Sequence, residues 1–350
     1  MTVLFLYSEL ADYFLKCCDE LSATDEVHII RWPVNNEAPF HFNFSEKIKV
    51  YDKKMFSENQ LSQLASKINP DIIVCSGWVD RDYLSLTKRY FKKIPTVLTC
   101  DTQWRGSLKQ YLAVFLSPFF LLNTFSHAWV PGEIQAKYLN KLGFKKGIIK
   151  KKFYCCDLTR FNAIYNKQKN QKHLAFPKRF LYVGRYYNFK GITDLWEAFI
   201  ELKAENSNDW ELWCLGVGDI TPIKHPHIKH FGFVQPKDLE PILSQCGVFV
   251  LPSRFEPWGV VVQEYAAAGL PLLLSNSVGA KEVFLEESKN GYSFLSGNVS
   301  NIKQHLKKIT ELSDKELLLM SEKSNALAQQ INLKDWANTL SEIYDDYRKN

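Results

Sequence analysis

The sequence lacks an apolar run long enough to cross a bilayer. The longest such run, YLAVFLSPFFLLNTF (111–125), falls short of the roughly 20 residues that a membrane-spanning helix needs, and Pro118 interrupts it. No membrane-spanning segment is therefore predicted. We expect residues 111–125 to form a buried core helix, with contact to a lipid surface as the alternative.

Several cofactor motifs are also missing. The segment after the first apolar run, YSELADYF, has no glycine, and Gly216 and Gly218 lack the third glycine of a dinucleotide-binding turn. The absence of any Gly-Lys-Ser/Thr sequence excludes a P-loop. The eight cysteines include no Cys-x-x-Cys and no Cys/His cluster with zinc spacing. We therefore expect reduced core thiols and neither an NAD-type cofactor nor a zinc site.

Length and charge limit the remaining possibilities. A chain of 350 residues with 46% hydrophobic and 23% charged residues is large enough for two globular domains. Residues 1–170 hold 24 Lys and Arg against 16 Asp and Glu, whereas residues 171–350 hold 20 against 22. The basic half is expected to attract an anionic surface or substrate, although a solvated basic face explains the same charge. The amino terminus lacks the features of a signal peptide, so a cytoplasmic location is expected.

Short apolar runs alternate with helical stretches in both halves of the chain. The first half contains TVLFLY, EVHIIRW, IKVYD, PDIIVCSGW, PTVLTCD, HAWVPG and IIKKKFYC, and the second contains RFLYVGR, WELWCLGVGD, HIKHFGF, VFVLPS and PLLLSN. Such alternation predicts an α/β fold with two Rossmann-like, doubly wound domains that face each other across a cleft. The polar residues 162–178 are interpreted as an interdomain linker. We predict domains over 1–165 and 175–330, and a carboxy-terminal helix over 331–350 that packs back on the first domain.

Two acidic positions in the first half have competing interpretations. Asp80 and Asp82 form Asp-x-Asp, a manganese-binding pattern, but they precede YLSLTKRYF, where Asp80 is better explained as a helix cap. Asp101, in VLTCDTQW, follows a predicted strand. It is expected either to point into the cleft or to cap a helix.

The segment SRFEPWGVVVQEYAAAG (253–269) lies between two apolar runs, and its composition predicts a loop followed by a helix. Glu256 is then placed at the carboxyl end of a strand, where open α/β sheets bind ligands, and Glu264 lies on the helix. A carboxylate accepts two hydrogen bonds from a vicinal diol. The two glutamates therefore favour a sugar ligand.

Cationic residues follow the preceding strand. Arg185 comes directly after Gly184 in RFLYVGRYYNFKG, and Lys190 follows five residues later. A forked guanidinium and a mobile ammonium together suit a diphosphate. Gly259 begins a helix whose free N–H groups form a further anion site.

Taken in order, VGR…K and LPSRFEPWGVVVQEYAAAGLP resemble the E-x7-E motif of retaining glycosyltransferases of family 4, which have the GT-B fold. The resemblance covers about residues 180–285. It implies transfer of a hexose from a nucleoside-diphosphate sugar to a hydroxyl acceptor, with retention at the anomeric carbon and without a metal or other cofactor.

The resemblance also implies roles for particular residues. Glu264 would hold the ribose, Glu256 would face the hexose, and Arg185 and Lys190 would bind the diphosphate. Asp101 would lie near the reacting sugar. The other substrate-binding residues implied by the motif are Gly184, Phe233, Val234, Phe255, Pro257, Trp258, Gly259 and Val260.

The expected partners are a UDP-, GDP- or ADP-sugar donor and a glycan or glycolipid acceptor, of lipid-linked or lipopolysaccharide type. The basic first half favours peripheral contact with the anionic inner face of the cell membrane, and no nucleic-acid partner is expected. Two alternatives share the same two-domain plan: a sugar-nucleotide epimerase or a phosphorylase. A non-catalytic protein that binds sugar nucleotides or glycans is a third.

Overall fold

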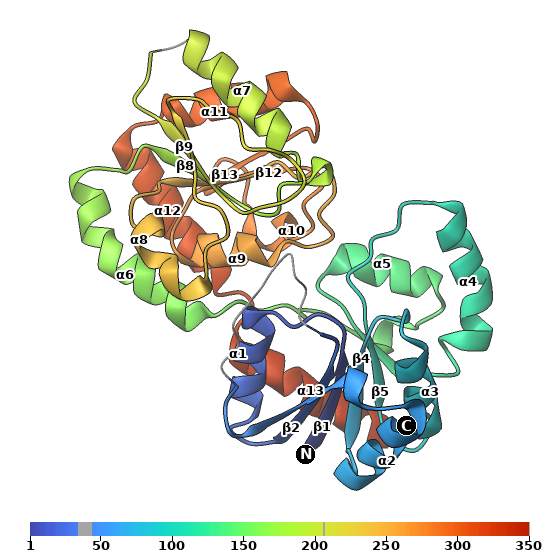
Figure 1. Cartoon of the computed structure of the whole chain (residues 1–350). Helices are drawn as coiled ribbons and strands as arrows, with labels where there is room; N and C mark the ends of the chain where they lie inside the picture. Colours follow the sequence, from blue (N-terminus) through green and yellow to red (C-terminus); the bar gives the residue numbers. More distant parts are fainter. Residues whose placement is uncertain (34–43, 206, 350) are drawn as a thin grey trace. The chain divides into compact units, whose positions relative to one another are not determined.

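A computed structural model describes residues 1–33, 44–205 and 207–349 of the chain (Figure 1). The chain divides into two compact units. Unit 1 comprises Met1–Cys156 with Ile331–Asn350, and unit 2 comprises Asp157–Gln330. Each unit is described separately below.

Unit 1 is built on a parallel sheet of seven strands. The strands are β1 (Thr2–Tyr7), β2 (Glu26–Arg31), β3 (Ile48–Asp52), β4 (Ile72–Ser76), β5 (Thr96–Thr99), β6 (His127–Trp129) and β7 (Ile149–Lys150). Their order across the sheet is β3-β2-β1-β4-β5-β6-β7. Consecutive residues of β1 and β4 are buried on both faces, which explains why their sequences are continuous apolar runs and do not alternate.

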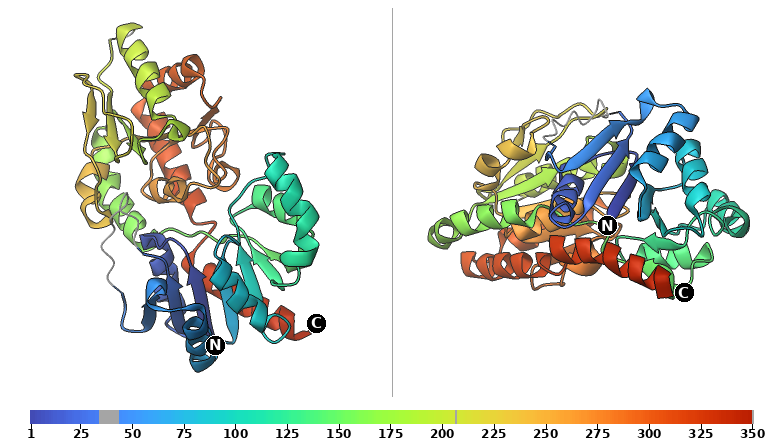
Figure 2. Two further views of the ribbon diagram at one scale, coloured as in Figure 1. Left: turned by 45° about the vertical axis from the view of Figure 1, so that its right-hand side comes forward. Right: turned by 90° about the horizontal axis from the view of Figure 1, so that it is seen from below.

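The helices of unit 1 connect these strands. They are α1 (Asp12–Leu21), η1 (Lys53–Met55), α2 (Glu58–Ile68), α3 (Arg81–Tyr90), α4 (Leu108–Phe120), α5 (Glu133–Lys141), η2 (Lys146–Ile148) and α13 (Leu333–Lys349). Ser57 and Ser107 begin α2 and α4 with capping boxes. Figure 2 shows α13 running along unit 1, where it packs against α1. Its Trp336 is buried and donates a hydrogen bond to the carbonyl oxygen of Phe153 at 2.5 Å.

Unit 2 contains a second parallel sheet, of six strands. They are β8 (Arg179–Val183), β9 (Glu211–Leu215), β10 (Ile228–His230), β11 (Val248–Leu251), β12 (Leu272–Ser275) and β13 (Gly291–Phe294). The order across the sheet is β10-β9-β8-β11-β12-β13. The chain therefore moves outward in one direction from β8 and in the other from β11. The predicted α/β class with two doubly wound domains is confirmed.

The helices of unit 2 are α6 (Leu158–Leu174), η3 (Asn188–Lys190), α7 (Ile192–Glu205), η4 (Pro236–Asp238), α8 (Glu240–Leu243), α9 (Val260–Ala267), α10 (Lys281–Phe284), α11 (Val299–Thr310) and α12 (Asp314–Ala328). Helix α7 packs against α11, while α6, α9 and α12 pack against one another.

The predicted linker over residues 162–178 is wrong. Most of this segment belongs to α6, which lies within unit 2. Its polar composition conceals a helical stripe of buried side chains, and these are Phe161, Ile164, Tyr165, Gln168 and Lys172. The spacing of the buried residues, rather than the average polarity, decides the structure.

The prediction that residues 111–125 form a buried core helix is also wrong. Helix α4 covers the first part of this segment, and most of its large apolar side chains are exposed. In the ranges that the structure describes, no helix combines the length and apolar character needed to cross a membrane.

Candidate functional site

The site residues of unit 2 gather where the strand order reverses. Strands β8 and β11 are neighbours, and both end at the same edge of the parallel sheet. Gly184 and Arg185 directly follow β8, and the loop with Glu256 follows β11. This edge, next to the reversal of strand order, is where doubly wound sheets bind their ligands.

A close ion pair lies at the centre of this edge. The Lys190 ammonium donates a hydrogen bond to Oε2 of Glu256 at 2.5 Å, and these side chains are only 15% and 10% exposed. The Ser253 hydroxyl donates to the same oxygen at 3.1 Å. Both charges are therefore compensated although they are largely withdrawn from water.

Backbone contacts explain how residues so far apart in sequence meet. The carbonyl oxygen of Phe189 accepts hydrogen bonds from the N–H groups of Arg254 and Phe255, at 2.8 and 3.1 Å. Gly191 follows with a φ of +67°, and a Cβ at this position would lie 2.2 Å from the carbonyl oxygen of Pro252. The short η3 turn is therefore pressed against the loop after β11, and this contact brings Lys190 to Glu256.

A second set of backbone bonds fixes the other side of the loop. The carbonyl oxygens of Glu256 and Trp258 accept from the N–H groups of Gly279 and Ala280, at 3.1 and 2.9 Å. The Trp258 indole is 2% exposed and meets the ring of Phe284 edge-on. Trp258 therefore supports the loop from the core, and its side chain does not face solvent.

Helix α9 begins beside the ion pair. Its first turn has no side-chain cap, and Gly259 occupies the N-cap with a φ of +93°. A Cβ on Gly259 would lie 3.0 Å from Cγ of Glu256, so a larger residue would crowd the carboxylate. Val260 and Glu264 follow on the helix and are half-buried. The positive end of α9 thus lies beside Glu256, with a second carboxylate about one turn further on.

Arg185 lies over an aromatic support. Its guanidinium lies 5.5 Å from the centre of the Tyr187 ring, and the Tyr182 hydroxyl donates to its carbonyl oxygen at 2.9 Å. That hydroxyl would lie 2.9 Å from a Cβ on Gly184. Glycine therefore leaves room for the tyrosine that anchors the Arg185 backbone.

The two glycines of LGVGD have a structural role in the ends of β8 and β9. A Cβ on Gly216 would lie 2.0 Å from the carbonyl oxygen of Gly184, and one on Gly218 would lie 2.4 Å from that of Tyr186. These glycines permit close backbone approach behind Arg185. Their spacing without a third glycine is explained by this packing.

Phe233 and Val234 follow β10, which is separated from β8 by β9. Both side chains are half-buried, as are those of Phe255 and Pro257 in the loop after β11. Phe233 and Val234 lie after a strand at the outer side of the same sheet.

An ion pair that the sequence did not suggest steadies the loop. Arg254 holds Asp194 of α7 with two hydrogen bonds, at 2.8 and 2.6 Å. This contact raises the pKa of Arg254 above its usual value. Arg254 had no recognisable signal because its partner is 60 residues away in sequence.

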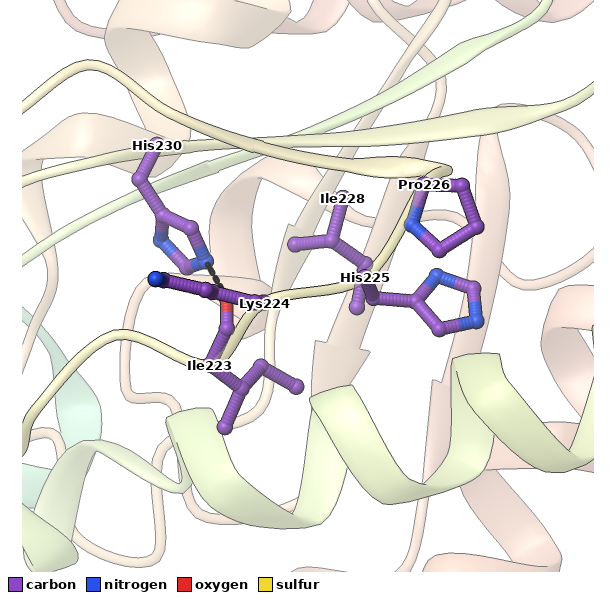
Figure 3. Close-up of a pocket in the computed structure, with 6 residues that line it drawn as sticks. All are labelled: Ile223, Lys224, His225, Pro226, Ile228 and His230. Carbon is purple, nitrogen blue, oxygen red and sulfur yellow. Dashed lines mark hydrogen bonds between the residues drawn. The ribbon is translucent and has the colours of Figure 1, made fainter.

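Figure 3 shows a separate hollow beside β10, lined by residues between Ile223 and His230. His230 closes one side, since its ring contacts the Tyr186 hydroxyl at 3.0 Å and the Ile223 carbonyl oxygen at 3.1 Å. Burial lowers the pKa of His230. None of the residues predicted for the site line this hollow.

Unit 1 holds the remaining predicted residue, Asp101, after β5. The Tyr154 hydroxyl donates to Oδ2 of Asp101 at 3.2 Å. Burial raises the pKa of Tyr154 well above its usual range, and the Asp101 carboxylate raises it further. The phenol therefore remains a donor and holds Asp101 at the sheet edge.

The Asp-x-Asp pair has the predicted capping role. Asp80 is the N-cap of α3 and accepts from the N–H groups of Asp82 and Tyr83. Lys53 lies 2.5 Å from Asp80 and 3.0 Å from Asp82. Among the residues that the structure describes, no group of three or more His, Cys, Asp or Glu side chains is arranged to hold a metal ion.

Comparisons with known proteins agree with this arrangement. Residues 177–312 match the family model for glycosyl transferases group 1. The chain is 30% identical over 204 residues to spore coat protein SA of Bacillus subtilis, a match that covers 53% of this chain and 52% of that protein. It is 26% identical over 267 residues to the N,N'-diacetylbacillosaminyl-diphospho-undecaprenol alpha-1,3-N-acetylgalactosaminyltransferase of Campylobacter jejuni, covering 71% of this chain and 68% of that enzyme. The chain thus spans about half the length of the first relative and about two thirds of the second.

Solved structures share the fold across nearly the whole chain. HepE of Anabaena, crystallised with UDP and glucose, has a TM-score of 0.69 at 16% identity. The match covers 99% of this chain and 100% of HepE. A glycosyltransferase from Rickettsia africae has a TM-score of 0.74 at 14% identity, covering 100% of this chain and 99% of that one. The fold is that of the GT-B glycosyltransferases.

Proposed function

We propose that this protein is a retaining, metal-independent glycosyltransferase of family 4. It transfers a hexose from a nucleoside-diphosphate sugar to a hydroxyl group of a growing lipid-linked or lipopolysaccharide-type glycan. One observation carries the proposal: the Lys190–Glu256 pair lies at the carboxyl edge of the sheet, where Arg185 and the start of α9 also lie. Cations for a diphosphate and carboxylates for a sugar are thereby gathered at one strand-order reversal.

In this proposal, Arg185 and Lys190 bind the diphosphate, together with the N–H groups at the start of α9. Glu264 accepts hydrogen bonds from the ribose hydroxyls, and Glu256 accepts them from the hexose. Because Glu256 contacts Lys190 directly, a phosphate held by Lys190 has the attached sugar next to Glu256. Phe233 and Val234 border the base, and Asp101 of unit 1 acts near the reacting sugar.

The reaction replaces one bond at the anomeric carbon with another on the same face of the sugar. The acceptor oxygen forms a bond to the anomeric carbon while the bond from that carbon to the phosphate oxygen breaks. The departing phosphate oxygen takes the acceptor's proton. Lys190, Arg185 and the α9 amides stabilise the negative charge that grows on the leaving group, each donor contributing about 3 to 4 kcal/mol.

A lipid-linked acceptor would place the reaction at the inner face of the cell membrane. The relative from C. jejuni acts on a diphospho-undecaprenol substrate, as its name states. A comparable acceptor would be embedded in the bilayer through its lipid. Peripheral contact with an anionic membrane would bring the basic unit 1 to such an acceptor.

A donor screen tests this function. Purified protein is incubated with UDP-, GDP- and ADP-hexoses, and binding is followed by thermal shift and turnover by radiolabel transfer to a membrane lipid extract. A transferase converts donor only with the extract, with retained anomeric configuration. An epimerase turns over with donor alone, and a phosphorylase requires inorganic phosphate. Thermal shift without any turnover indicates a binding protein.

A further inference from the structure

Helix α4 turns small or polar side chains inward and large apolar side chains outward. Among the side chains turned into unit 1 are two polar ones, Gln110 and Ser117. Gln110 donates to the Gln103 carbonyl oxygen at 2.7 Å, and Ser117 donates to that of Leu142 at 2.6 Å. These hydrogen bonds fix which face of the helix is turned inward.

The outward face of α4 is apolar apart from Lys109 in its first turn. Its large exposed side chains are Leu108, Tyr111, Leu112, Phe115, Leu116, Phe119 and Phe120. Most are spaced three or four residues apart and so form one continuous stripe, which we call the α4 stripe. Phe115 and Phe119 are 72% and 74% exposed. Figure 1 shows α4 at the outer side of its unit. A contiguous apolar stripe of this kind marks an interaction surface.

The sequence around the α4 stripe is strongly basic. Residues 102–156 contain nine Lys and Arg residues and one acidic residue, Glu133. Glu133 is paired with Lys151, and Lys150 is paired with Glu342 and Asp346 of α13. The Lys141 ammonium lies 4.8 Å from the centre of the Trp104 ring, and this ring meets Tyr111 of the stripe at 5.0 Å. A cation is therefore held at the edge of the apolar surface.

We propose that α4 lies in the interface of an anionic lipid bilayer. The α4 stripe enters the boundary between headgroups and acyl chains, while Lys109, Lys141, Lys145 and Lys146 contact the headgroups. Apolar burial and electrostatic attraction together give the two signals that stable peripheral binding requires. A second copy of the chain is a less suitable partner for the α4 stripe, because the lysines beside the two stripes would repel each other. The inference rests on the proposed function, since a lipid-linked acceptor accounts for the membrane contact.

The test is flotation of the full chain with phosphatidylcholine vesicles, with and without phosphatidylglycerol. The wild-type protein floats with the anionic vesicles, and the bound fraction falls at high salt. Phe115→Ser with Phe119→Ser lowers the partition coefficient by roughly tenfold or more. The matched control, Met55→Ser with Leu319→Ser, replaces two exposed apolar residues outside α4 and leaves flotation unchanged.

Two charge-reversal variants test the electrostatic contribution separately from the apolar one. Lys145→Glu with Lys146→Glu lowers binding to anionic vesicles by roughly tenfold or more, because each cation near the surface contributes to attraction. Lys237→Glu with Lys315→Glu makes the same charge change in unit 2 and has no such effect. Hydrogen exchange of the amides over 108–120 slows in the presence of anionic vesicles.

Flotation of the Phe115/Phe119 variant equal to that of the wild-type protein would overturn the inference. A second outcome would also overturn it: the wild-type protein does not bind vesicles but forms a concentration-dependent dimer, and the Phe115/Phe119 variant does not form this dimer. The α4 stripe would then be a self-association surface. Thermal shift with UDP in the absence of lipid tests the donor site by itself. A protein that floats through α4 without responding to any nucleotide sugar would refute the proposed function and leave the role of α4 intact.

Discussion

At the scale of single residues, the Lys190–Glu256 pair sets the charge of the site before a ligand arrives. The two groups are 2.5 Å apart and sheltered from water, so they largely neutralise each other. A diphosphate brings more negative charge than this pair can balance, and Arg185 supplies a further cation. Leaving-group stabilisation should therefore depend on Lys190, and nucleotide affinity on Glu264.

We expect Lys190→Ala to lower the rate of transfer by about 10²- to 10³-fold with a smaller loss of nucleotide affinity. Glu264→Ala should weaken nucleotide binding by roughly ten- to a hundredfold, because a charged acceptor of two ribose hydrogen bonds is lost. Calorimetric titration and radiolabel transfer separate the two effects, with Lys237→Ala as the control. Full transfer by both variants would show that the site is assigned wrongly.

Lys172 is a charged residue in the core of unit 2. Its ammonium donates to the carbonyl oxygen of Gly269 at 3.2 Å, and burial lowers its pKa to about 8. The folded pKa lies below the unfolded one, so the unfolded chain binds more protons between about pH 8 and pH 10.5. Protonated Lys172 therefore destabilises the fold at neutral pH, and this cost disappears as the pH rises through that window.

Lys172→Met should stabilise the protein by about 3 kcal/mol at pH 7, with the advantage shrinking toward pH 10.5. The Gly269 carbonyl oxygen keeps a donor in the variant, because the Ser321 hydroxyl also contacts it. Urea unfolding of both proteins across this pH range measures the difference. Among the buried thiols, Cys246 titrates differently in the two proteins, because burial raises its pKa and the Lys172 charge lowers it, so both proteins are compared in a Cys246→Ala background. A difference that does not change with pH would contradict the buried-charge explanation.

At the scale of elements, the η3 turn positions Lys190 through its contact with the loop after β11. Gly191→Ala places a Cβ 2.2 Å from the Pro252 carbonyl oxygen and also strains a left-handed residue with φ +67°. We expect a loss of stability of about 1 to 3 kcal/mol and a fall in transfer similar to that of Lys190→Ala. Thermal unfolding and transfer assays measure both effects.

Gly297→Ala is the control for this prediction, because Gly297 has a φ of +71° while its nearest neighbour would lie 3.7 Å from the added Cβ. It carries the backbone strain without the clash. Equal transfer by the two variants would show that the contact between η3 and Pro252 does not position Lys190.

The sequence predicted those elements whose local pattern matches their environment. Strands β8 and β11 are short apolar runs, and Asp80 has a local capping pattern, so each was recognisable. Helices α4 and α6 were misinterpreted because their average composition opposes their burial. The contact between Lys190 and Glu256 depends on backbone bonds across 66 residues, which no local pattern records. The roles of these residues in catalysis stay predictions.

At the scale of the whole molecule, unit 2 is continuous in sequence whereas unit 1 is made of two segments. Its second segment contributes Trp336, which stacks on Phe5 and lies edge-on to Phe14 in the core. A fragment that ends at Cys156 would leave those aromatic rings uncovered. The alternation of strands and helices made both domains predictable, but it could not show which side chains of unit 1 the final helix covers.

We therefore expect residues 157–330 to fold alone and to keep a thermal shift with the donor nucleotide. Residues 1–156 should aggregate, whereas the same residues joined to 331–350 by a short Gly/Ser linker should fold cooperatively. Circular dichroism and calorimetry of the three proteins check this. An independently folded 1–156 fragment would mean that α13 is dispensable for unit 1.

The Cys155 thiol lies 3.6 Å from the Ile331 carbonyl oxygen, so the chain leaves unit 1 and returns to it at nearly the same point. In sequence, unit 2 is therefore an insertion at one position of unit 1. Because its two ends lie close together, unit 2 can be replaced by the corresponding unit of a relative without changing the path of the chain in unit 1. If the proposed function holds, the donor specificity of unit 2 can be engineered separately from the acceptor specificity of unit 1.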